Sequence, residues 1–171
     1  MSADHSASRR RWRRPLSKRP VGLAVVIAAL VSASSAAAGE KDVRSCDFEV
    51  KARCASGDAR VTLADGVVQR LEVNVFWCGL RGHPGYTCTI DSSRGDADAK
   101  WSEEAGATLI ANTAPFNPQA PDRVKVTAGK NVSIDMEQAQ SLGRCGAGAE
   151  LPRMIVIPER GKACQVRLPS P

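Results

Sequence analysis

The sequence predicts an all-β fold: a single β-sandwich or barrel of about seven to nine short antiparallel strands, stabilised by disulfides and with at most one short helical turn. Three observations lead to this prediction. Apolar and polar residues alternate over short stretches, and turn sequences rich in Gly, Pro and Asp separate these stretches. Six cysteines, an even number, all lie beyond residue 38.

The first 38 residues have the order of a secretory signal peptide. Basic residues at 9–19 precede an apolar run at 21–31, and small residues follow up to Ala38. We expect cleavage after Ala38, which leaves 171 − 38 = 133 residues, enough for one β-rich domain at 39–171. The apolar run is short for a membrane span, so an uncleaved signal anchor is the alternative. Membrane contact is expected only through this segment.

Residues 8–12, Ser-Arg-Arg-Arg-Trp, resemble a bacterial twin-arginine export signal. Arg13 departs from the apolar residue that usually follows in that motif, so Sec export remains an alternative. Either route predicts a bacterial protein that is periplasmic or secreted.

The basic excess of the chain belongs to this leader. Of 24 Lys and Arg, seven lie in residues 1–38, and of 18 Asp and Glu, one does, which leaves 24 − 7 = 17 bases and 18 − 1 = 17 acids. A domain with no net charge lacks the basic excess that the neutralisation of nucleic-acid phosphates requires. We therefore expect no nucleic-acid partner.

The strongest strand signal is at residues 67–77, where Leu71, Val73 and Val75 alternate with polar residues, as a sheet with one wet face requires. Asp65-Gly66 just before it predicts a hairpin turn, since type I′ turns need residues that tolerate positive φ. Strands are expected, in chain order, at 42–54, 60–63, 67–77, 86–91, near Trp101 and 108–110, and at 124–126, 132–136, 154–157 and 163–168.

The sequence also predicts the structure of three segments that connect strands. Residues 55–58 are predicted to form the first turn, and 137–142 the only helical turn, ended by Gly143. Three prolines at 112–121 indicate an extended loop, because proline removes ladder donors. Phe116 in that loop is either an exposed anchor for a partner or, as we expect, a cap that packs on the core.

The cysteine count behind a signal peptide predicts three disulfides formed in an oxidising compartment. Zinc is disfavoured because no closely spaced cysteine pair is present. Cys78 ends one strand and Cys88 begins the next, so a hairpin favours Cys78–Cys88. The remaining pairs stay open, with Cys46–Cys54 disfavoured because one strand would hold them about 26 Å apart. The six cysteines are Cys46, Cys54, Cys78, Cys88, Cys145 and Cys164.

The connection at 78–88 is the candidate binding loop, because it contains Arg81, His83 and Tyr86 in a chain poor in histidine and aromatics. We expect its main role to be structural, as a connection between two strands that a disulfide closes. Should it act, we expect it to present a side chain to a partner. One specific version is Arg81 held by a Cys78–Cys88 bond for the specificity pocket of a trypsin-like protease.

The leading functional hypothesis is a non-enzymatic binding module that contacts an unidentified protein or envelope partner through its loops. The hypothesis rests on what the sequence lacks, because it contains no motif typical of an active site, a cofactor site or a metal site. We therefore assign no catalytic, cofactor-binding or metal-ligating residue and expect no cofactor. One alternative is a hydrolase that uses His83 with nearby carboxylates such as Asp91. The other is a structural component of an envelope assembly. We interpret the remaining acids of the 91–104 segment as a solvated loop.

Overall fold

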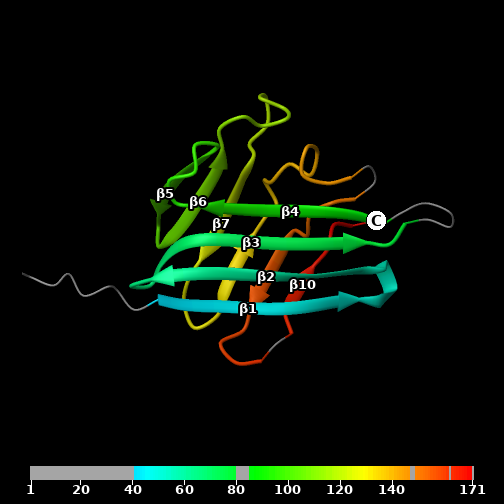
Figure 1. Ribbon diagram of the computed structural model, residues 1–171, viewed down its shortest axis with the longest axis horizontal. Helices are drawn as coiled ribbons and strands as arrows, with labels where there is room; N and C mark the ends of the chain where they lie inside the picture. Colours follow the sequence, from blue (N-terminus) through cyan, green and yellow to red (C-terminus); the bar gives the residue numbers. More distant parts are fainter. Residues whose placement is uncertain (1–40, 80–84, 147–148, 162, 171) are drawn as a thin grey trace, which may run out of the picture. The chain divides into compact units, whose positions relative to one another are not determined.

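The predicted all-β, sandwich-like fold is confirmed. The computed structural model describes residues 41–79, 85–146, 149–161 and 163–170, all within the unit Ala37–Pro171. In this part of the chain ten strands form two antiparallel sheets, in the orders β1-β2-β3-β4 and β10-β9-β8-β7-β6-β5. Figure 1 shows the four-stranded sheet in front, with the strands of the six-stranded sheet running across it behind.

Each strand connects to the next strand of its sheet by a short turn or a loop. The four-stranded sheet consists of β1 (Lys41–Val50), β2 (Ala55–Ala64), β3 (Val67–Trp77) and β4 (Tyr86–Ser93). The six-stranded sheet consists of β5 (Ala99–Glu104), β6 (Ala107–Asn112), β7 (Arg123–Thr127), β8 (Val132–Asp135), β9 (Met154–Ile157) and β10 (Gln165–Arg167).

The core fills the space between the inner faces of the two sheets. Leu71 and Val73 of β3 are fully buried, as their alternation predicts, and they belong to one apolar cluster with Ile134 of β8 and Ile155 of β9. Full burial of each such side chain contributes about 1.5–3 kcal/mol. Because the cluster draws on both sheets, it is what holds the two layers together.

The β2–β3 hairpin has the predicted turn. Asp65 and Gly66 have φ values of 51° and 75°, the positive pair that a type I′ turn requires. The register then shifts between Thr62 and Leu63, which leaves Gln69 of β3 as an extra residue. The main-chain oxygen of Gln69 accepts a hydrogen bond from the backbone N–H of Arg94 at 3.0 Å.

The first strand and its turn differ from the prediction. β1 ends at Val50, a 3₁₀ turn covers Lys51–Arg53, and Cys54 adopts the left-handed conformation with φ 47°. The chain therefore reverses at 51–54, and residues 55–58, which were expected to turn, begin β2. The sequence hides this reversal because no glycine occupies the left-handed position.

The helical turn expected at 137–142 is not a helix. Among the backbone N–H groups of this segment, that of Ala139 donates in the helical direction, to the oxygen of Met136 at 3.0 Å. The next N–H, that of Gln140, instead donates to the carboxylate of Asp122 at 3.0 Å. A tertiary contact thus replaces the bond that would extend the turn. Gly143 does have the positive φ, 85°, expected after it.

The six cysteines form three disulfides, as predicted, but the favoured pair Cys78–Cys88 is wrong. The bonds are Cys46–Cys164, Cys54–Cys78 and Cys88–Cys145. In the β3–β4 hairpin Cys88 lies opposite Val75 rather than opposite Cys78, and its side chain is fully buried. Cys78 is bonded instead to Cys54, the residue that precedes β2, and the Cα atoms of the two cysteines are 5.5 Å apart.

Each edge strand of the four-stranded sheet pairs over a short stretch with another segment of the chain. At β1, Asp47 bridges Ala163, and the Cys46–Cys164 bond lies beside that bridge. At β4, Cys88 bridges the same residue to which it is disulfide-bonded, Cys145. Short segments of chain therefore pair with each edge and are fixed there covalently. The three bonds indicate that the chain folds in an oxidising compartment.

Candidate functional site

Two long connections leave the six-stranded sheet at the same end. The β6–β7 loop spans 113–122 and the β8–β9 connection spans 136–153. β6 and β8 both run antiparallel to β7, so their carboxyl ends point the same way. Figure 1 shows the two connections close to each other at the top of the view. We call their described residues the loop pair.

A buried carboxylate joins the loop pair. The side chain of Asp122 is 2% exposed, and both of its oxygens accept hydrogen bonds from Arg144 Nη2 at 3.0 Å. Asn112 Nδ2 donates to one of these oxygens and the backbone N–H of Gln140 donates to the other, each at 3.0 Å. With four hydrogen bonds to charged or polar donors, the buried charge is satisfied.

The amide of Gln140 closes the Pro-rich loop. Its Nε2 donates to the main-chain oxygens of Asn117 at 2.9 Å and Ala120 at 3.0 Å, and its Oε1 accepts from the N–H of Asn117 at 2.7 Å. The second connection is in turn tied to β4 by the Cys88–Cys145 bond. Both loops are therefore held in one arrangement by side-chain hydrogen bonds and a covalent link.

The loop pair presents two large apolar side chains to solvent. Phe116 and Leu142 are each 66% exposed. A Cβ atom placed on Gly143, the residue next to Leu142, would lie 3.8 Å from Cβ of Phe116, so the two connections come close together here. We call Phe116 and Leu142 the loop patch. The expectation that Phe116 caps the core is wrong, because its side chain is exposed on a loop that hydrogen bonds with Gln140 hold in place.

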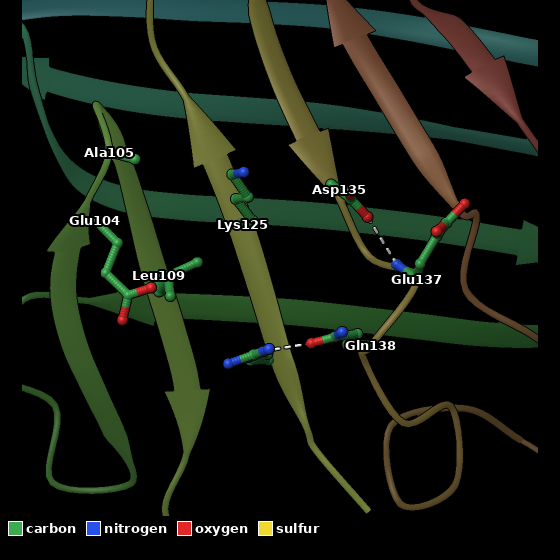
Figure 2. A pocket seen from close by; sticks show the side chains of 8 residues that line it. Glu104, Ala105, Leu109, Lys125, Asp135, Glu137 and Gln138 are labelled. Carbon is green, nitrogen blue, oxygen red and sulfur yellow. Dashed lines mark hydrogen bonds between the residues drawn. The ribbon is translucent and has the colours of Figure 1, made fainter.

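A pocket lies on the outer face of the six-stranded sheet. Its volume is about 330 Å3. Figure 2 shows Leu109 and Lys125 on its floor, with Glu104 on one side and Glu137 on the other. Charged residues of both signs line it, and Glu137 is already paired with Arg167. It offers no aromatic surface on which a ligand could stack, so we rank it below the loop patch.

The predicted binding loop is only partly described. Arg81 and His83 lie outside the described residues. Tyr86 begins β4, where it is half-buried, and a Cβ on Gly146 would lie 2.6 Å from its ring carbon Cδ1. The tyrosine is thus packed against the β8–β9 connection. The protease-inhibitor hypothesis for Arg81 loses its structural premise, since the Cys78–Cys88 bond is not formed.

The acids near the predicted loop are engaged in local contacts. Asp91 forms an ion pair with Arg70 at 2.9 Å. Asp96 accepts a hydrogen bond from the N–H of Ser93 at 2.5 Å, as a turn residue does. No cluster of three or more metal-ligating side chains occurs among the described residues. In the same part of the chain, no helix is long and apolar enough to cross a bilayer.

Comparison with protein-family models, with curated proteins and with solved structures found no match. The site therefore stands on geometry alone.

Sequence reasoning found Phe116 as a possible anchor but missed Leu142 and the buried Asp122. The sequence did contain one signal for Asp122. The residue lies just before a predicted core strand, and an aspartate that is buried at such a position needs a hydrogen-bonding or charged partner.

Proposed function

We propose that this chain is an exported, non-enzymatic binding module that recognises a protein partner through the loop patch. The observation that carries the proposal is that Phe116 and Leu142 are exposed on loops that a buried network holds in place. Large apolar side chains that are exposed close together at a protein surface are typical of interaction sites, and aromatic residues contribute strongly to binding energy.

The rigidity of the loop pair supports the same proposal. A side chain on a loose loop loses conformational entropy when it binds, which weakens affinity. Here the Asp122–Arg144 ion pair, the Gln140 bonds and the Cys88–Cys145 disulfide order both loops without a partner. The cost of ordering is therefore met during folding rather than at binding.

The proposed place of action is the periplasm or the exterior of a bacterial cell. The predicted signal peptide at 1–38 and the three disulfides are consistent with export to such a compartment. The partner would then be another envelope or secreted protein.

The test compares capture of partners by three purified, oxidised proteins. Wild type, the double variant Phe116→Ser/Leu142→Ser and the control Val43→Ser would each be immobilised and exposed to periplasmic extract and culture medium. Val43 is also exposed, 47%, but lies on β1, outside the loop pair. Circular dichroism would verify that all three retain the fold.

We expect one protein to be captured by wild type and by Val43→Ser, and its Kd for the double variant to rise about 100-fold, since each anchor contributes roughly tenfold. Equal capture of every protein by wild type and the double variant would refute the loop patch as the binding surface.

A further inference from the structure

A small polar cavity lies between the two sheets, beneath the loop pair. Its volume is about 70 Å3, and it is lined by residues of β4, β5, β6 and β7 together with Arg144. The exposed carboxylates of Asp91 and Asp98 also line it, so its mouth reaches solvent at their side. The cavity is large enough for one or two water molecules.

Two polar atoms at this cavity lack a hydrogen-bond partner among the described residues. They are Oγ of Ser92 and Nε of Arg144, both buried. Ser92 is 7% exposed and stands opposite Leu71, on the inner face of β4. A buried hydroxyl or guanidinium N–H without a partner is costly, and native proteins rarely leave such groups unpaired.

The charges around the cavity decide which ligand fits. Arg144 is neutralised by Asp122, Asp91 is paired with Arg70, and Asp98 adds negative charge at the mouth, so no positive charge is left over to favour an anion. The free N–H of Arg144 is a donor and cannot ligate a cation. A single partner for both groups would accept from Arg144 and also exchange a hydrogen bond with Ser92. A small neutral molecule with both capacities, such as water, meets these needs.

We propose that ordered water occupies this cavity and bridges Ser92 Oγ to Arg144 Nε. The water links Ser92 of β4, in the four-stranded sheet, to Arg144, which also forms the ion pair with Asp122. It thereby extends the network of the loop pair into the space between the sheets. Water becomes a structural ligand of this protein, with Asp91 and Asp98 flanking the route to bulk solvent.

The first test is a high-resolution crystal structure of the full chain in its oxidised form. We expect density for a water oxygen about 2.7–3.2 Å from both Ser92 Oγ and Arg144 Nε. A cavity without such density, or with the two atoms bonded to other protein groups, would overturn the proposal.

A second test uses the sign of a stability change. If water bridges the two groups, Ser92→Ala removes a used hydrogen bond, and Tm falls by about 2–4 °C. If the cavity is dry, the same variant removes an unpaired hydroxyl, and Tm stays the same or rises. Ser93→Ala is the matched control on the opposite face of β4, where we expect a change below about 1 °C. An unchanged or higher Tm for Ser92→Ala therefore rejects the bridging water.

Discussion

Gly57 of β2 lies against the ring of Phe48 of β1, directly opposite it on the inner face of the four-stranded sheet. A Cβ atom at position 57 would lie 2.8 Å from Phe48 Cζ and would also collide with the backbone oxygen of Asn74. The glycine therefore supplies space for an aromatic side chain at the edge of the core, and its lack of a side chain is a packing requirement.

Gly57→Ala should destabilise the protein by about 2–3 kcal/mol, because the added methyl group forces backbone or ring to move in a packed core. Urea denaturation of the oxidised protein measures the change. Gly129→Ala is the control, since a Cβ there meets only the oxygen of Asn131 at an ordinary 3.6 Å. Equal stabilities of the two variants would contradict the packing role of Gly57.

Ala105→Asn should stabilise the protein by about 0.5–1 kcal/mol. Ala105 and Gly106 have φ values of 48° and 78° and form the turn between β5 and β6. Alanine is strained in the left-handed region, whereas asparagine tolerates it. The reverse change in the equivalent turn, Asp65→Ala, should destabilise by a similar amount. Thermal unfolding of both variants gives the comparison, and the same sign for both would refute this explanation.

Asp122→Ala should lower stability by about 3–5 kcal/mol, since it leaves the part-buried Arg144 charge and the Asn112 and Gln140 donors unpaired. Limited proteolysis should then cut within 113–121 faster than in wild type. The double variant Asp122→Ala/Arg144→Met should recover part of the loss, because it removes the orphaned charge. No recovery would mean that the ion pair is not the dominant contact.

Removing the Cys46–Cys164 bond should cost more than removing Cys54–Cys78. Their sequence separations are 118 and 24 residues, and the chain-entropy relation converts this ratio into a difference of about 1.4 kcal/mol. Paired Cys→Ala variants and denaturant unfolding measure both losses. Peptide mapping of the non-reduced protein should first recover the three pairs, and a Cys78–Cys88 fragment would contradict the structure.

The sequence predicts those parts of the fold that local patterns determine. The alternation at Leu71, Val73 and Val75 places β3, and Asp65-Gly66 places its turn, because backbone preference and burial agree there. The turn at 51–54 escapes this reasoning, since Cys54 and Ala105 adopt left-handed conformations that their residue types do not signal.

The cysteine partners and the loop patch depend on contacts across long stretches of chain. Cys88 pairs with a residue 57 positions away, and only the packed sheets bring the two together. The exposure of Phe116 follows from bonds that Gln140, in a different connection, makes to its loop. Periodicity describes each segment by itself, so it could suggest Phe116 as an anchor but could not decide its orientation.

The short segments that pair with the edges of the four-stranded sheet have a consequence for the protein before its cysteines are oxidised. An uncovered edge strand is a template for pairing with another chain, which leads to aggregation. Without the Cys46–Cys164 and Cys88–Cys145 bonds, the segments on β1 and β4 are held by few hydrogen bonds. The newly made, reduced chain should therefore depend on chaperones, or on rapid disulfide formation, to stay monomeric.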